Sequence, residues 1–492
     1  MSVAHKAARG ALWTIISSMG GRAIGVVGTL AMTRFLHPKE IGEINDASVI
    51  ALSASWLSIW GWGQYAVVKG RGEDAAEVTF HAFIGYFVVG TVMLGLAALF
   101  GGHLAPFFGA PEAAAFIPGL CLAAWIRRFG AIPERVLSRT LNFRAAGIAA
   151  MMGELVYTLT ALSFAYFGYG GWSIVIANIV QSTVTAAILI RAAGFSSWLT
   201  PCKLTWSRYK AMLKFGLPLG IQGFFHGGSR YWDNLAISHF FGPAATGTYN
   251  MAYNLADIPA IQIGEQIALV LMPSMAELPP ERRPRALERS TALLSLIIFP
   301  LAVGLGLVAA PLIDLLLPSN DWQMVAPLLT VLACLSVFRP ITWVVSAYME
   351  AESKTNRLMI LEILKVALLI GGIAVLQQFG LRAAAGAVGV AFGATALAGV
   401  AVVVREGVSG RRLFIGFFQP LVCCAIMGAV TFGVYELLVT IGWDHPAILL
   451  VAMIVSGGAA YVVSALIIAR EASKDLLSLL KRALKRSPDA SA

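Results

Sequence analysis

Two stretches of the sequence decide the fold: FLHPKEIGEINDA, from Phe35 to Ala47, and FFGPAATGTYNMA, from Phe240 to Ala252. We interpret the match between them as an internal repeat, because each copy joins two long apolar stretches and the loops follow in the same order in both halves. A chance likeness between two turns rich in Pro and Gly is the alternative. The stretches align without a gap, with identical residues at Phe35/Phe240, Pro38/Pro243, Gly42/Gly247, Asn45/Asn250 and Ala47/Ala252.

The composition identifies the class of protein that carries this repeat. Of the 492 residues, 58% are hydrophobic and 13% are charged, and the mean hydropathy is +0.77. Soluble domains contain about 25% charged residues. The composition therefore excludes a soluble enzyme, a disordered protein and a disulfide scaffold. It predicts an all-α polytopic membrane protein, because the apolar runs are far too long for the strands of a membrane barrel.

Apolar runs long enough to cross a membrane follow one another along the whole chain. We read the basic N-terminal stretch as the start of the first span rather than as a signal peptide. A span needs about 20 residues, and on that basis we expect about fourteen transmembrane helices. They are centred in residues 11–36, 42–68, 79–101, 113–135, 147–167, 171–191, 211–241, 245–272, 290–317, 322–349, 358–379, 384–404, 413–440 and 446–469.

Basic residues gather in alternate connections between these runs and so predict the orientation. The outer connections hold almost no Lys or Arg, Lys39 and Arg382 being the exceptions. The positive-inside rule then places both termini in the cytoplasm of a bacterial inner-membrane protein. The net charge of +10 follows this layout, and no nucleic-acid partner is expected. The clusters assigned to the inside are Lys69/Arg71, Arg127/Arg128/Arg135/Arg139/Arg144, Lys203/Arg208/Lys210/Lys214, Arg282/Arg283/Arg285/Arg289, Lys354/Arg357, Arg405/Arg411/Arg412 and the tail from Arg470 to Arg486.

The tail itself has a pattern of its own. Leucines from Leu476 to Leu484 alternate with basic residues in a way that predicts an amphipathic cationic helix. Such a helix suits anionic lipid headgroups. A solvated helical tail is the alternative.

The repeat and the spans together predict how the chain is organised. An even number of helices per copy keeps the two halves parallel, and transporters built in this way place the substrate path between the halves. Weaker matches, such as Glu154 with Glu362, extend the repeat. The expected parts are a six-helix lobe (1–193), a cytoplasmic connector (194–210), a second six-helix lobe (211–405), two additional helices (406–470) and the basic tail (471–492).

Three stretches carry a resemblance to a known family. The segment GALWTIISSMGGRAIGVVGTLAMTRFLHPKEIGEIN (10–45) resembles the first helix and turn in the polysaccharide branch of the multidrug/oligosaccharidyl-lipid/polysaccharide flippase superfamily. PERVLSRTLNFR (133–144) and GYGGWSIVIANIV (168–180) resemble a connection and the sixth span of Wzx-type exporters of the colanic-acid type. The resemblance implies that an undecaprenyl-pyrophosphate-linked oligosaccharide crosses the inner membrane for assembly of surface polysaccharide such as O-antigen. It also implies pathway partners, the glycan polymerase and glycosyltransferases.

Ionisable side chains inside the spans are few and therefore informative. Each costs about 2.5–3.5 kcal/mol on insertion scales, so it usually faces a cavity or a partner. Arg22 and Arg230 lie at similar depths in the equivalent first helices of the two halves, and Arg339 precedes Pro340 in the tenth span. We expect these arginines to bind pyrophosphate oxygens with their planar forks. The alternatives are local: Arg230 pairs with Asp233 at i,i+3, and Arg339 satisfies carbonyls freed at the proline.

Aromatic and amide side chains at the same levels are candidates for contact with sugar. Interfacial anchoring is the alternative for the aromatic ones. These substrate-binding candidates are His226, Tyr231, Trp232, Tyr249 and Asn250. Candidates for carrying a coupling proton or ion are Asp46, Asp233 and Asp257. Hydrogen bonding to a helix end is the alternative for Asp46 and Asp257. Glu362 and Lys365, also at i,i+3, are expected to form a structural ion pair.

The motifs of catalysis are missing from the sequence. It has no Walker A run, no nucleophile elbow and no HExxH, and its five cysteines lack disulfide or metal spacing. We therefore expect a transporter without cofactors or metal, working as a monomer by alternating access. A multidrug exporter of the same superfamily is the nearest alternative, followed by a membrane-embedded glycan polymerase or ligase and by a membrane scaffold.

Overall fold

The computed structural model describes residues 20–21, 23–69, 75–140, 142–259, 264, 266–317, 319–352 and 354–485. Helices, turns and bends account for all of the secondary structure in these ranges. By length and composition, nine of the described helical stretches are able to cross a membrane. Further spans are divided into shorter helices, so the all-α polytopic fold is confirmed.

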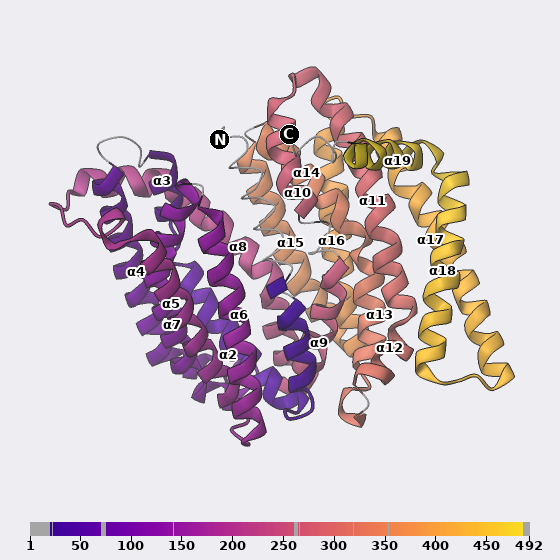
Figure 1. Ribbon diagram of the computed structural model, residues 1–492, viewed down its shortest axis with the longest axis horizontal. Helices are drawn as coiled ribbons and strands as arrows, with labels where there is room; N and C mark the ends of the chain where they lie inside the picture. Colours follow the sequence, from indigo (N-terminus) through magenta and orange to yellow (C-terminus); the bar gives the residue numbers. More distant parts are fainter. Residues whose placement is uncertain are drawn as a thin grey trace. The chain divides into compact units, whose positions relative to one another are not determined.

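Over the described residues, each predicted span contains a helix or a broken pair of helices. Figure 1 shows these helices coloured in chain order. Described residues Ala23–Met32 form an apolar helix in the first span. The remaining spans of the first half contain α2 (Pro38–Trp56) with α3 (Trp62–Lys69), α4 (Ala75–Leu104), α5 (Ile117–Arg139), α6 (Phe143–Tyr166) and α7 (Trp172–Ala193). The second half contains α8 (Trp206–Phe241), α9 (Pro243–Pro259) with α10 (Gln266–Glu277), α11 (Arg283–Leu307) with α12 (Ala309–Leu316), α13 (Val325–Leu335) with α14 (Arg339–Ala351), α15 (Thr355–Leu376) and α16 (Leu381–Val404). The last elements are α17 (Gly410–Ile441), α18 (Pro446–Ile468) and the tail helix α19 (Arg470–Lys485).

Proline and glycine account for two of the interruptions in the spans. The second span breaks between α2 and α3, where Gly61 has a φ of +65° that only glycine adopts without strain. The tenth breaks between α13 and α14, where Pro340 stands in the first turn of α14 and removes a donor from the hydrogen-bond ladder. Broken backbone at membrane depth persists only where protein groups satisfy it.

The chain forms two compact units, residues 1–247 and 248–492. Within the first, α7 packs on both α5 and α6, and α2 packs on α4, α5 and α8. Within the second, α15 packs on α16, and α17 packs on both α11 and α18. The boundary between the units falls inside α9. The lobes predicted from the repeat, divided at 194–210, rest on sequence equivalence and remain a prediction.

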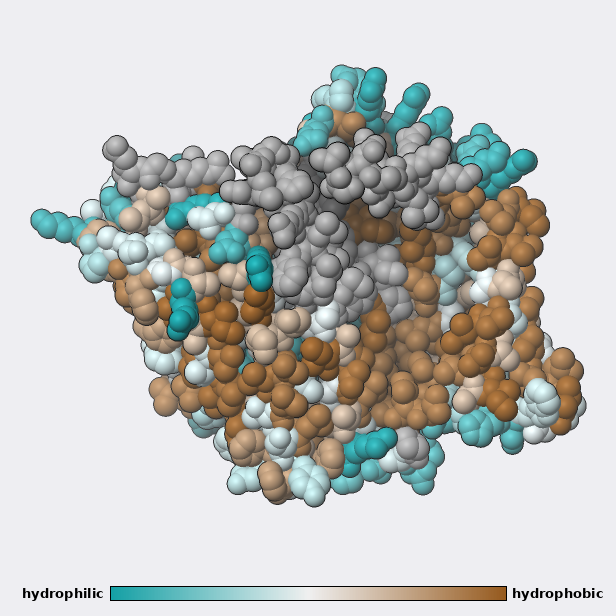
Figure 2. Space-filling view, viewed as in Figure 1, coloured by the Kyte–Doolittle hydropathy of each residue, from teal (hydrophilic) through white to brown (hydrophobic). Residues whose placement is uncertain are grey.

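The surface of the helices is apolar where lipid would cover it. Figure 2 shows hydrophobic residues over the middle of the helices on the visible face, with hydrophilic residues gathered toward their ends. Exposed side chains such as Leu99 on α4 and Ile467 on α18 belong to this surface. A protein that exposes so many large hydrophobic residues along its helices is built for a bilayer.

One part of the predicted topology is wrong. Arg127 and Arg128 were placed among the cytoplasmic residues, but they occupy the middle of α5, ten or more residues from both of its ends. Uncharged, mostly apolar residues flank the two arginines from Ile117 to Ile126 and from Phe129 to Ile132. Together they outweigh two adjacent charges when the helix packs among neighbours. The basic residues near the C-terminal end of α5 begin at Arg135.

Candidate functional site

In the first unit, α2 and α8 are joined by a seam of polar and aromatic side chains. The hydroxyl of Ser238 donates a hydrogen bond to the carboxylate of Asp46, and both residues are buried. About two turns further along the same seam, the Trp232 indole N–H donates to the hydroxyl of Ser53 at 3.0 Å. The structure thus brings Asp46 and Trp232, both predicted site residues, to one helix interface.

The aromatic part of this seam continues toward the break in the second span. The rings of Trp56 and Tyr231 lie 5.5 Å apart between centroids. Tyr231 is half-buried. The ring of Trp232, the other predicted ligand here, packs edge-to-face on the ring of Phe224, with 5.0 Å between the centroids. Both rings therefore pack within the protein over part of their surface and leave part of it exposed.

The other predicted residues of α8 lie at different depths. His226 is exposed, Arg230 is half-buried and Asp233 is buried. The Asp233 carboxylate accepts hydrogen bonds from the Asn234 backbone N–H at 2.9 Å and from the Asn234 amide at 3.1 Å. Arg22, the predicted partner of Arg230 in the other half, lies outside the described residues.

Arg128 is a buried cation that the sequence did not single out. Its guanidinium donates to the carbonyl oxygen of Tyr86 at 3.0 Å, to the carbonyl oxygen of Ser55 at 3.4 Å and to the hydroxyl of Ser58. The same group lies over the ring of Tyr86, 4.4 Å from its centroid. Because Ser55 lies in the last turn of α2 and Ser58 lies two residues beyond its end, Arg128 places its positive charge at the negative end of that helix.

A second polar group of the first unit lies near the middle of α6. The Gln181 amide on α7 donates to Glu154 Oε2 at 2.9 Å. The other carboxylate oxygen lies against the first span, 2.6 Å from where a Cβ on Gly25 would be, so only glycine leaves it room. Arg127 on α5 is close enough to Glu154 to interact with it electrostatically. Glu154 was noted in the sequence only as a repeat match.

In the second unit, the predicted residues Arg339 and Asp257 form an ion pair. Arg339 also donates to the hydroxyl of Tyr253 at 3.2 Å, and its guanidinium lies 5.1 Å from the centroid of the Phe392 ring. Both members of the pair are buried. Asp257 therefore neutralises the charge of Arg339 in this structure, and an anionic ligand would have to compete with that carboxylate.

The remaining predicted ligands lie on α9. Tyr249 is fully buried, with its ring 5.9 Å from that of Tyr253, so it packs in the core beside the Arg339 pair. Asn250 is half-buried, and its side-chain oxygen accepts a hydrogen bond from the Asn254 amide at 2.9 Å. The matching residue of the repeat, Asn45, lies on α2 in the first unit.

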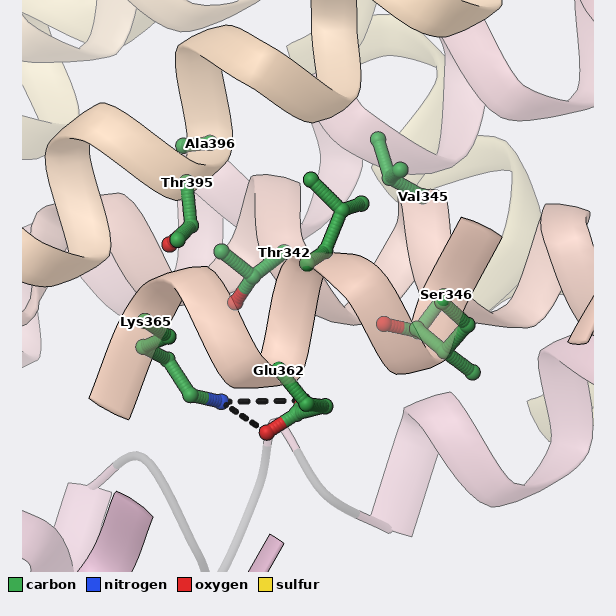
Figure 3. A pocket seen from close by; sticks show the side chains of 9 residues that line it. Thr342, Val345, Ser346, Glu362, Lys365, Thr395 and Ala396 are labelled. Carbon is green, nitrogen blue, oxygen red and sulfur yellow. Dashed lines mark hydrogen bonds and ion pairs between the residues drawn. The ribbon is translucent and has the colours of Figure 1, made fainter. Parts of the chain in front are cut away.

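The predicted pair of Glu362 and Lys365 is confirmed and lines a small cavity. The two side chains meet at 2.8 Å on α15, beside Thr342 and Ser346 of α14 and Thr395 of α16 (Figure 3). The cavity has a volume of about 20 Å³, enough for a single water molecule. The Lys365 ammonium also lies 5.2 Å from the centroid of Phe392, the ring that Arg339 contacts as well. One aromatic ring thus separates two buried cations, each with its own carboxylate.

Known proteins with similar sequences act in polysaccharide assembly. The family described as "Polysaccharide biosynthesis protein" matches residues 31–327. The succinoglycan biosynthesis transport protein ExoT of Rhizobium meliloti is 27% identical over 65% of the chain, and the match spans 64% of ExoT, just under two thirds. The lipopolysaccharide biosynthesis protein WzxC of Escherichia coli is 23% identical over 80% of the chain and 78% of its own length.

Solved structures with a similar fold are transport proteins of the membrane. The lipid II flippase MurJ in an inward closed conformation superposes with a TM-score of 0.76 over 94% of this chain and 99% of that one, at 15% identity. An inward-facing multidrug resistance transporter of the MATE family gives a TM-score of 0.56 over 81% of this chain and 93% of its own, at 18% identity. At these identities the likeness is one of fold.

Proposed function

The chain belongs to the polysaccharide biosynthesis protein family, and on that premise we propose that it is a flippase for a polyprenyl-pyrophosphate-linked oligosaccharide. It moves this lipid from the cytoplasmic to the periplasmic leaflet of a bacterial inner membrane by alternating access, for assembly of a surface polysaccharide. Two of the relatives support this proposal by name, a succinoglycan biosynthesis transport protein and a lipopolysaccharide biosynthesis protein.

The balance of charge inside the membrane supports an anionic cargo. Asp257 and Glu362 are each held by a basic partner, Arg339 and Lys365. Arg127, in contrast, is an exposed cation at the middle of α5. A cargo that carries a pyrophosphate needs positive groups at membrane depth, and arginine binds phosphate oxygens in pairs.

A multidrug exporter is the second candidate, because the MATE fold is also similar. A pump for cationic drugs is expected to present carboxylates without basic partners to its cargo, which the pairs of Asp257 and Glu362 do not offer. Deleting the gene distinguishes the two: loss of surface polysaccharide with unchanged drug susceptibility supports the flippase, and the reverse supports the exporter.

Reconstitution provides the direct test. Purified protein in liposomes should move a fluorescent lipid-linked oligosaccharide between leaflets, and Arg22→Ala and Arg230→Ala should each lower the rate by at least about tenfold, the effect of one lost charged contact. Arg191→Gln, at the exposed end of α7, is the matched control and should retain the wild-type rate. Full activity of both alanine variants at normal expression would contradict the assignment of Arg22 and Arg230. A glycan of altered length after the assay would instead indicate an enzyme.

We propose further that both termini lie in the cytoplasm, that the protein works as a monomer without cofactors, and that the pathway's polymerase and glycosyltransferases act beside it. The tail helix α19 supports a role at the headgroup level. It is anchored by an ion pair of Asp475 with Arg289 at 2.8 Å and by a hydrogen bond from Ser473 to the Ala465 carbonyl oxygen at 3.0 Å. Its exposed basic residues, such as Lys474, then suit anionic lipids. Labelling of single cysteines from either side of the membrane tests the orientation.

A further inference from the structure

Arg127 is the residue whose position the rest of the fold leaves unexplained. It stands ten residues from the first residue of α5 and twelve from the last. At 1.5 Å per residue, each end of the helix is therefore about 15 Å away or more. Arginines near helix ends extend their side chains to the headgroups, but Arg127 is too deep for that.

Arg127 is an exposed residue, unlike its buried neighbour Arg128. Across the part of the chain that the structure describes, no hydrogen-bond acceptor or carboxylate lies within bonding distance of Arg127, whereas Arg128 has four acceptors. The first span packs along α6 at Gly21, Gly25 and Gly28, and it brings no counter-charge, because the first acidic residue of the sequence is Glu40.

Glu154 is held back from Arg127 by its own contacts. Gln181 binds one carboxylate oxygen at 2.9 Å, and the other lies in the space left by Gly25. The carboxylate thus lowers the cost of a charge at this depth through its field, and among the described residues the five donors of the guanidinium have no bonded acceptor. An unfilled planar fork inside a membrane protein is suited to an oxyanion that arrives from outside.

From this geometry we propose that Arg127 binds a phosphate-type oxyanion within the membrane, beside the Glu154 carboxylate that Gln181 holds in place. Resting on the proposed function, we assign this oxyanion to the pyrophosphate of the lipid-linked cargo. The same chemistry occurs in the headgroup phosphate of ordinary phospholipids, so the experiment has to separate the two sources.

The test measures binding of farnesyl pyrophosphate, a short polyprenyl pyrophosphate, to the full-length protein in detergent. Arg127→Gln should weaken binding at least about tenfold, the loss expected for one charge-assisted pair. The affinity of Arg127→Lys for the probe should lie between those of wild type and Arg127→Gln, because an ammonium keeps the positive charge but lacks the planar fork of donors. Glu154→Gln should bind the probe as tightly as wild type or more tightly. The substitution removes a carboxylate that repels the pyrophosphate, and its side-chain oxygen can still accept the hydrogen bond from the Gln181 amide.

Folding and specificity are controlled separately. Since Arg127 has no bonded partner in the described chain, Arg127→Gln without ligand should melt at the wild-type temperature, and Arg191→Gln should bind the probe as wild type does. Equal affinity of wild type and Arg127→Gln would overturn the proposal. Displacement of the probe by phosphatidylglycerol at equal concentration would overturn the assignment to the lipid-linked cargo, because the oxyanion bound at Arg127 would then be a phospholipid headgroup. Wild-type protein that binds the probe but flips no glycan in liposomes would contradict the proposed function and support the anion site alone.

Discussion

The backbone of Gly42 lies against the carbonyl oxygen of Pro243, so closely that a Cβ on Gly42 would overlap it. The contact is reciprocal, because a Cβ on Gly247 would overlap the carbonyl oxygen of Pro38 in the same way. Pro38 matches Pro243 and Gly42 matches Gly247 in the repeat. The two copies of the turn that decides the fold therefore touch each other through equivalent residues.

The first prediction concerns this contact. Replacing a helical glycine by alanine ordinarily stabilises a helix by about 1 kcal/mol. At Gly42 we expect the opposite, a fall in melting temperature and in yield of folded protein, because the added methyl must force two backbones apart. Gly95→Ala on α4 is the control, since nothing lies within 4 Å of a Cβ there. Size-exclusion chromatography after heating measures both, and a Gly42→Ala variant as stable as Gly95→Ala would contradict the reading of the contact.

The second prediction concerns the buried Arg128. Arg128→Gln should lower the free energy of unfolding by about 3 kcal/mol, the value of one or two hydrogen bonds to a charged group. The carbonyl of Ser55 and the hydroxyl of Ser58 would lose their donor at a broken helix inside the membrane. Gly90→Ala should have a similar effect, because its Cβ would overlap the guanidinium of Arg128.

Comparison with the neighbouring residue makes this prediction decisive. Arg127→Gln changes the same residue type one position away on the same helix, and it should leave the stability unchanged. If Arg127→Gln and Arg128→Gln destabilise the protein equally in denaturation of the purified protein, then the contacts of Arg128 do not hold the break after α2.

The third prediction concerns the pair of Asp257 and Arg339. Asp257→Asn leaves a buried guanidinium without its carboxylate and should cost about 3–5 kcal/mol of stability. The double variant Asp257→Asn/Arg339→Gln removes both charges and should recover most of that loss. A double-mutant cycle on thermal unfolding measures the coupling, and additive effects of the two substitutions would show that the pair contributes nothing beyond its separate members.

Sequence reasoning recovered the fold because hydropathy and charge act on whole segments. A run of apolar residues long enough to cross the bilayer has one favourable state, and every predicted span contains a helix or a broken pair of helices. The pairing of Glu362 with Lys365 was also predictable, because residues at i,i+3 on a helix are neighbours whatever surrounds them.

The charged residues of α5 were misplaced because their partners are distant in the sequence. Arg128 is stabilised by Ser55, Ser58 and Tyr86, which reach it only after α2, α4 and α5 have packed. Asp257 and Arg339 are separated in the same way. Arg127 and Arg128 stood beside other basic residues, so the rule for cytoplasmic loops applied to them as well. The available signal was the apolar sequence on both sides of the two arginines.

The last prediction uses the charged side chains at the ends of α11, α14 and α16. Arg283 forms an ion pair with the Glu352 carboxylate at 2.6 Å. Lys354 forms ion pairs with the same carboxylate at 3.6 Å and with the Glu406 carboxylate at 2.8 Å. The hydrogen bond from Arg283 holds the pKa of Glu352 below its ordinary value, partly opposed by burial and assisted by Lys354. Lys354 keeps its charge, because the contact with Glu406 raises its pKa in spite of burial.

A carboxylate whose pKa is lowered by folding stabilises the protein above its unfolded pKa, about 4.3 for glutamate, and loses that contribution as the pH falls through the lower folded value. Wild type should therefore be more stable than Glu352→Gln at neutral pH, and the difference should vanish in acid below the folded pKa. Melting temperatures of both proteins across this range give the difference directly, which removes the effect of other titrating groups common to both. Glu436→Gln, at the far end of α17, is the control and should follow wild type at every pH. A difference between wild type and Glu352→Gln that stays constant down to about pH 3, well below the ordinary glutamate pKa, would show that the contact with Arg283 does not depend on the charge of Glu352.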